Sequence, residues 1–171
     1  LPLTGNMNLL FFSGPNVFNI NGIKHFIYNV YPDIKKEISN LKLMIGGKIC
    51  DVIKEWDLPK DIELKGEYED QKEFYKLGDI AINPVFQGTG LKIKTFESLS
   101  YGRITIVHKH SCEGVYNKEI SPLLIADSSE DYINHIKTYQ TLNSRENMQI
   151  DIQKYMMSFQ QHVKNEFKKA L

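Results

Sequence analysis

The sequence predicts an α/β fold built on a doubly wound, parallel β-sheet. Short apolar runs alternate with segments of helical periodicity along the whole chain, which is the order of a sheet whose strands are joined by helices. Most of these runs are apolar at every position, so the strands are expected to be buried on both faces. No repeat, low-complexity tract or change in composition divides the 171 residues. We therefore expect residues 1–171 to form one domain, with a ligand at the carboxyl ends of the strands.

The first half of the chain contains three predicted strands and three predicted helices. The strands are expected at residues 9–12, 41–45 and 62–66, and the helices at residues 21–31, 50–56 and 70–77. The first helix is predicted from apolar residues at helical spacing between Ile23 and Val30, and it can extend past Pro32. The pair Gly46 and Gly47 ends the second strand.

The second half continues the alternation. Strands are expected at residues 80–84, 104–107 and 123–126, and helices at residues 90–101, 130–139 and 144–169. In helix 90–101 the residues expected to pack on the sheet are Ile93, Phe96 and Leu99 or Ser100. Ser128 and Asp131 have the spacing of a capping box and predict a helix start at this point.

Composition excludes several classes of protein. The 21 basic residues balance the 21 acidic ones, so we expect no nucleic-acid partner, and any site for an anion must be local. Cys50 and Cys112 lack metal-ligand spacing and are expected to be reduced thiols. No apolar run approaches the ~20 residues that span a membrane, no signal peptide is visible, and residues 1–5 match a cell-wall sorting signal only in their letters. We expect a cytoplasmic protein.

The most informative segment runs from Gly88 to Glu97. It leads from a predicted strand into a predicted helix, and free N–H groups at a helix start attract phosphate. The candidate phosphate-binding residues are Thr89, Gly90, Leu91, Lys92 and Lys94. Glu97 shares a face with Lys94 and could accept hydrogen bonds from ribose hydroxyls. The residues alone fit equally well a solvated turn with a Lys94–Glu97 surface pair.

Two further loops are predicted at the same edge of the sheet. The loop from Ser13 to Gly22 offers Gly14, Asn21 and Gly22 as donor-side contacts, and the alternative is a plain turn with Asn21 as the helix N-cap. Glu67 and Tyr68 follow the third strand, where they could lie beside a base. The alternative, which the residue types favour, is a tyrosine that covers the edge of the core.

The histidines and the remaining acidic residues do not predict a metal site. His108 and His110 alternate along an extended segment, but no third ligand is evident. His25 is expected to be a surface or half-buried residue of the first helix. Asp127 and Glu130, beside the capping box, are typical of helix-cap chemistry.

Several segments together resemble one family of enzymes. The similar pieces, in order, are Phe12–Gly14, Asn21–Gly22, Ile45–Gly47, Gly66–Tyr68, Asn83–Pro84, Gly88–Gly102 and Cys112–Val115. The series covers nearly the whole chain and resembles the C-terminal half of group 1, family 4-like glycosyltransferases. The block from Gly88 to Lys94 is fairly specific to the family. The other pieces are weak evidence singly and strong evidence together.

The resemblance implies a GT-B architecture of two Rossmann-like halves. The C-terminal half binds the nucleotide-sugar donor (UDP-, GDP- or ADP-linked), and the other half binds a glycan or lipid-linked acceptor, so we expect this chain to be one half of a longer protein. Such enzymes usually retain anomeric configuration and need no metal or other cofactor. The full-length enzyme could associate with the inner face of the membrane. The last helix would return toward the absent half, and its apolar residues Ile152, Tyr155, Met156, Phe159 and Val163 are expected to leave an exposed patch.

This chain departs from the family pattern at two places. Many members carry two acidic residues eight positions apart; Glu97 matches the second, which commonly meets ribose, but Thr89 stands at the first. Pro15 and Asn21 stand where many members carry basic residues for the diphosphate, so Lys92 and Lys94 are the candidates for that charge.

The leading prediction is therefore the donor-binding domain of a glycosyltransferase that acts in bacterial polysaccharide synthesis. The fragment alone is expected to bind a nucleoside diphosphate without transferring sugar. A nucleotide-sugar 2-epimerase of the same architecture and a non-catalytic nucleotide-binding module remain as alternatives. The sequence singles out no catalytic residue.

Overall fold

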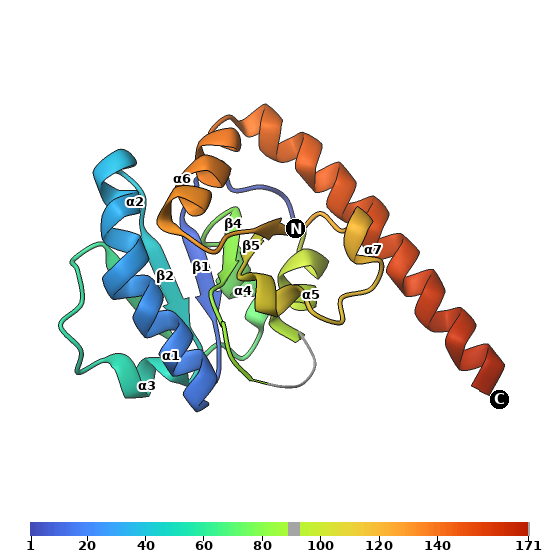
Figure 1. Cartoon of the computed structure of the whole chain (residues 1–171), viewed down its shortest axis with the longest axis horizontal. Helices are drawn as coiled ribbons and strands as arrows, with labels where there is room; N and C mark the ends of the chain where they lie inside the picture. Colours follow the sequence, from blue (N-terminus) through green and yellow to red (C-terminus); the bar gives the residue numbers. More distant parts are fainter. Residues whose placement is uncertain (89–92, 171) are drawn as a thin grey trace.

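The computed structural model describes residues 1–88 and 93–170 and contains one parallel sheet of six strands in this part of the chain (Figure 1). The strands are β1 (Leu9–Phe12), β2 (Leu43–Gly46), β3 (Ile62–Gly66), β4 (Ile80–Asn83), β5 (Ile104–Val107) and β6 (Leu124–Ile125). Their order is β3-β2-β1-β4-β5-β6, and every pairing is parallel. The chain winds outward from β1 in one direction and from β4 in the other. The crevice between the carboxyl ends of β1 and β4 is therefore the expected ligand position.

Helices cover both faces of the sheet. They are α1 (Val17–His25), the π-helix η1 (Phe26–Val30), α2 (Tyr31–Glu37), α3 (Ile49–Ile53), α4 (Gln71–Tyr75), α5 (Ile93–Ser100), α6 (Ser129–Thr138) and α7 (Leu142–Ala170), with short 3₁₀ turns η2 (Lys109–Cys112) and η3 (Lys118–Ile120). Helices α2 and α6 pack against each other, whereas α7 packs against α5 and β5. The carboxyl-terminal part of α7 extends away from the rest of the molecule (Figure 1). None of the helices in the described residues has both the length and the apolar run that crossing a bilayer requires.

The predicted fold class is confirmed, and so are the six strands, because buried parallel strands have continuous apolar runs. Leu9 in β1 pairs with Leu43 on one side and Ile80 on the other, and all three side chains are fully buried. The capping box of Ser128 and Asp131 is also confirmed.

The predicted start of the first helix is wrong. The helix begins at Val17, and Asn16 is its N-cap, because the Asn16 side chain accepts a hydrogen bond from the Asn19 backbone N–H. Asn21 therefore lies inside the helix rather than in a loop or at the cap. The prediction for Ile93 is also wrong, since this side chain is 67% exposed; the buried face of α5 consists of Thr95, Ser98 and Leu99.

Helix α1 and the π-turn η1 that continues it contact the turn that follows α3. The ammonium group of Lys24 lies 5.6 Å from the centre of the Trp56 ring. The Tyr28 hydroxyl donates a 3.2 Å hydrogen bond to the backbone carbonyl of Asp57. These contacts fix one side of α1 against the α3 region of the fold.

The first residues of the chain are fixed to the amino-terminal edge of the sheet. Asp79, immediately before β4, is fully buried, and its carboxylate accepts hydrogen bonds from the backbone N–H groups of Thr4 (2.6 Å) and Gly5 (3.1 Å) and from the Thr4 hydroxyl (2.9 Å). Arg145 of α7 completes the arrangement with an ion pair: its Nε lies 3.1 Å from the same carboxylate. This edge is thus held by a buried charge with a full set of partners.

Candidate functional site

Two segments meet at the carboxyl edge of the sheet, between β1 and β4. A Cβ atom on Gly22 of α1 would lie 3.0 Å from the backbone Cα of Val85 and 3.2 Å from the Pro84 carbonyl oxygen. A Cβ on Gly88 would lie 2.9 Å from the Phe18 ring, and Gly88 has a positive φ of 106° that side chains rarely adopt. The start of α1 and the segment after β4 are therefore in close contact, and glycine permits this contact at both points.

The three predicted residues of the first segment have different surroundings. A Cβ on Gly14 would meet no atom within 4 Å, so the backbone there is open to a ligand. Gly22 is buried against the β4 segment, and its role in the structure is helix packing. Asn21 is exposed on α1, where it lines a shallow hollow of about 350 Å³ together with Lys24 and Phe86.

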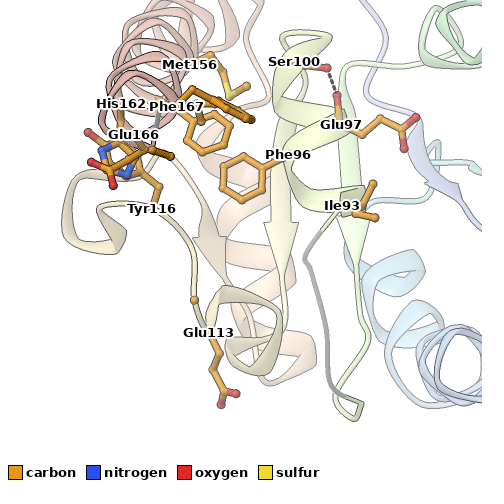
Figure 2. A pocket seen from close by; sticks show the side chains of 14 residues that line it. Ile93, Phe96, Glu97, Ser100, Glu113, Tyr116, Met156, His162, Glu166 and Phe167 are labelled. Atoms are coloured by element: carbon orange, nitrogen blue, oxygen red, sulfur yellow. Dashed lines mark hydrogen bonds between the residues drawn. The ribbon is translucent and has the colours of Figure 1, made fainter.

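Glu97 is half-buried on α5, the helix that follows β4. Burial raises the pKa of its carboxyl group above the ordinary value, although Lys94 acts in the opposite direction. The side chain points away from Phe96 and from the α7 residues (Figure 2), and its charge in turn raises the pKa values of Tyr75 and Tyr101, whose own burial is the larger cause. No described residue donates a hydrogen bond to the carboxylate. A half-desolvated carboxylate of this kind favours a ligand that donates hydrogen bonds.

Lys94 is half-exposed in the first turn of α5. It lies within electrostatic reach of Glu97. Thr89, Gly90, Leu91 and Lys92, the other predicted phosphate contacts, lie outside the described residues, so their roles stay predictions.

Glu67 and Tyr68 lie beyond β3, at the same edge of the sheet. The Tyr68 ring packs edge-on against Phe74 with 5.7 Å between ring centres, which agrees with the covering role that its residue type favoured. Glu67 is exposed, 4.0 Å from the ammonium group of Lys48. The structure thus leaves the base contact of Glu67 as a prediction and gives Tyr68 a packing role.

Three polar side chains that the sequence did not predict hold the segment after β4 in place. The Asn83 amide donates a 3.0 Å hydrogen bond to the Thr95 hydroxyl, tying β4 to α5, while its Oδ1 is buried without a partner. The Ser111 hydroxyl donates to the Val85 carbonyl at 2.8 Å, and Nε2 of His110 lies 2.7 Å from the Gly88 carbonyl oxygen. The sequence signals for these residues were the Asn83–Pro84 piece of the family resemblance and the alternation of His108 and His110, which was weighed only as metal chemistry.

Comparison with known proteins identifies the family. Residues 7–141, more than three quarters of the chain, match the model of the family described as "Glycosyl transferases group 1". The chain belongs to the group 1 glycosyl transferases. The resemblance in its motifs and the architecture of its sheet agree with this assignment.

Relatives of this group 1 glycosyl transferase chain include proteins of known and unknown role. It is 26% identical over 147 residues to an uncharacterized 44.6 kDa protein in the cps region of Klebsiella pneumoniae, covering 78% of this chain and 37% of that protein. Anabaena HepE in complex with UDP and glucose superposes with a TM-score of 0.60 at 13% identity, covering 96% of this chain and 48% of that one. WaaG, a glycosyltransferase involved in lipopolysaccharide biosynthesis, gives 0.59 at 15% identity, covering 88% and 42%.

These likenesses establish the fold of the group 1 chain as that of the C-terminal half of a GT-B glycosyltransferase. The chain spans less than half the length of each of these relatives. In the described residues no group of three or more histidine, cysteine or acidic side chains is arranged to hold a metal ion, and Cys50 and Cys112 are both buried.

A large apolar groove of about 1060 Å³ separates α5 from the outer part of α7 (Figure 2). The Phe96 ring stacks on Phe159 with 4.6 Å between centres, and Tyr116 stacks on His162 at 4.5 Å. The structure confirms the predicted apolar patch on α7 only in part. Ile152 and Tyr155 are buried in the core, whereas Met156, Phe159 and Val163 line this groove.

Proposed function

We propose that this chain is the donor-binding half of a glycosyltransferase that transfers a sugar from a nucleotide sugar to a glycan or lipid-linked acceptor in bacterial polysaccharide synthesis. Membership of the group 1 family supports the reaction class. The names of its relatives, which include a protein of a cps region and a glycosyltransferase of lipopolysaccharide biosynthesis, support the pathway class. HepE, which was crystallised with UDP, makes a uridine nucleotide the first donor to test.

The observation that carries this proposal is the half-buried Glu97 carboxylate without a described hydrogen-bond donor. Two ribose hydroxyls would supply the missing donors. Gly14, with open space around its backbone, and Gly88 would lie along the diphosphate, and Lys92 and Lys94 would neutralise its charge. Bound in this way, the donor needs no metal or other cofactor in this half.

The other half of the enzyme would carry the main acceptor site. We assign the apolar groove between α5 and α7 to contact with that half. Met156, Phe159 and Val163 line the groove, and contact with the other half would shield these apolar side chains from water. The isolated chain is then expected to bind nucleotide without transferring sugar, and retention of configuration is a property to measure in the full-length enzyme.

Calorimetric titration of Glu97→Gln tests the donor site. The substitution keeps the shape of the side chain and removes its charge, so UDP binding should weaken by roughly 1 to 3 kcal/mol while pyrophosphate binding changes little. The panel of UDP, GDP and ADP on the wild-type chain identifies the base. Equal losses for UDP and pyrophosphate would reject the ribose role of Glu97, and a wild-type chain that binds none of the three nucleotides would reject the donor function.

A further inference from the structure

A second cavity, of about 340 Å³, lies on the α1 side of the carboxyl edge. Its walls include Phe26 and Val30 of η1, Phe86 after β4, and Tyr132 of α6. Its volume falls at the small end of the range for ligand pockets in proteins, and its walls are mainly apolar, as ligand pockets usually are. Pro84 and Phe86 of its lining belong to the segment after β4, which also borders the crevice between β1 and β4.

The helical backbone is distorted where it passes this cavity. Residues Phe26–Val30 form a π-helical turn between α1 and α2, and the first and last residues of that turn both line the cavity. Single π-turns inserted in helices occur frequently at functional sites, because they widen the helix and redirect its side chains. The distortion is thus an observation independent of the cavity itself.

Tyr132 places a hydroxyl group in these apolar surroundings. The residue is only 3% exposed, and its ring meets the Phe26 ring edge-on at 5.1 Å. Burial raises the pKa of the phenol well above its ordinary value, so the group keeps its proton. No described residue forms a hydrogen bond with the Tyr132 hydroxyl. The hydroxyl is not among the fully buried side-chain atoms that lack a partner, so it is accessible from the cavity that Tyr132 lines, where a ligand hydroxyl can pair with it.

The rim of the cavity carries a neutral imidazole and a carboxylate. Nδ1 of His108 accepts a hydrogen bond from the His110 backbone N–H (3.2 Å), so the ring proton resides on Nε2, 3.5 Å from Asp127 Oδ1. Burial lowers the pKa of His108 and keeps it uncharged near neutral pH. The other carboxylate oxygen of Asp127 lies 3.2 Å from the ammonium group of Lys109. Lys109 thus offsets the charge of Asp127 at the rim.

His25 adds a donor on the opposite side of the rim. Its Nδ1 lies 3.2 Å from the Asn29 side-chain amide, which leaves the other ring nitrogen to carry the proton. Its ring meets the Phe86 ring edge-on at 5.7 Å. The cavity therefore combines aromatic walls, N–H and O–H donors and a carboxylate acceptor, without excess charge. A neutral sugar ring has the complementary chemistry, with an apolar face and several hydroxyl groups.

We propose that this cavity binds a neutral sugar ring and is a subsite for the acceptor, an inference that rests on the proposed donor function. Phe86 stands two residues before Gly88, so their Cα atoms are at most ~7 Å apart. On the other strand, His108 stands two residues before His110, which contacts the Gly88 carbonyl. A sugar in the cavity would therefore lie beside the glycine segment to which the donor phosphates are assigned.

Methyl hexosides are the probes that test the site, observed by NMR chemical-shift mapping on this chain. Methyl glucoside, galactoside or mannoside should shift the resonances of Tyr132 and Ala126 at millimolar concentration. Tyr132→Phe removes only the hydroxyl, so sugar affinity should fall about 2- to 10-fold while the melting temperature is kept. Tyr139→Phe, which changes a tyrosine outside the cavity, is the matched control and should leave sugar binding unchanged.

Competition with nucleotides separates the possible roles of the cavity. Sugar shifts that persist in saturating UDP, and that UDP-glucose does not remove, support an acceptor subsite. Displacement by UDP-glucose but not by UDP would show that the cavity holds the sugar of the donor and would overturn the acceptor role. Shifts caused by tetramethylammonium or phosphate in place of the hexosides would overturn the sugar assignment, as would the absence of any shift at the cavity. UDP titration without sugar scores the donor function separately.

Discussion

Two carboxylates, one immediately before β4 and one on the helix after it, differ in the hydrogen-bond partners that the chain provides. At the amino edge, Asp79 is fully buried and has three hydrogen-bond donors and an arginine. On α5, the helix after β4, Glu97 is half-buried, has a raised pKa, and receives no hydrogen bond from the described residues. Asp79 immediately precedes β4 and Glu97 lies on the helix that follows it, so the difference comes from the groups that surround each carboxylate.

This difference separates charges that serve the fold from charges that serve a ligand. Desolvating a carboxylate is costly unless partners replace the lost water, and at the amino edge the chain supplies those partners itself. A carboxylate that is partly desolvated without them has a perturbed pKa, which is a property that clusters at functional sites. Three sets of substitutions test whether the first region serves stability and the second serves a ligand.

The largest effect is expected from Asp79→Asn at the amino edge. The change leaves Arg145, whose side chain is 3% exposed, as a buried charge without its counterion. We expect a loss of about 3 to 5 kcal/mol of unfolding free energy in urea denaturation. Asp33→Asn, which breaks an exposed pair with Lys36, is the control and should barely move the midpoint. A small loss in Asp79→Asn would mean that the amino edge is not held by this charge.

A smaller effect is expected from alanine at the two glycines of the first segment. Gly22→Ala places a Cβ 3.0 Å from the Val85 backbone and should cost about 1 to 3 kcal/mol of stability through overpacking. Gly14→Ala adds a methyl group in open space and should leave stability unchanged or slightly higher. If the diphosphate lies along Gly14, the same Gly14→Ala variant weakens UDP binding. Equal stabilities of the two variants would contradict the packing role of Gly22.

The smallest effect is the pH dependence of stability that Glu97 causes. Its folded-state pKa lies above the unfolded value, so its contribution to stability is present at low pH. That contribution is lost as pH rises from the ordinary value near 4.5 through the raised one. Glu97→Gln should remove this slope and raise stability at pH 7 by up to about 0.5 kcal/mol. Thermal melts from pH 4 to 8 measure it, and parallel curves for both proteins would reject a desolvated Glu97.

Patterns within a few residues predicted the fold, whereas contacts between distant residues escaped prediction. The strands and the capping box follow from local composition, and both were placed correctly. The start of α1 was missed because Val17 and Phe18, in its first turn, are 57% and 41% exposed and give no amphipathic signal. Asn16 has the residue type of an N-cap, but Asn21 has it too, and only the backbone distinguishes them.

The candidate site was predictable in part for the same reason. Glu97 was proposed from its spacing in a glycine-led helix; the structure shows it half-buried, and its ribose role stays a prediction. The ion pair of Asp79 with Arg145 joins residues that are far apart in the sequence, and the contact of His110 with Gly88 joins segments that follow different strands. The π-turn at Phe26–Val30 has no sequence signature, so the cavity beside it became visible only in the structure.

Trp56, over which the ammonium group of Lys24 lies, is a fluorescent reporter within the chain. Trp56 is the one tryptophan in the sequence, and it is in contact with Lys24 and Tyr28 of the first helical segment. Its fluorescence therefore reads the junction between α1 and the turn after α3, whereas far-ultraviolet circular dichroism averages over all helices and strands. Coincident transitions by the two methods would show that the α1 side and the rest of the sheet unfold as one cooperative unit.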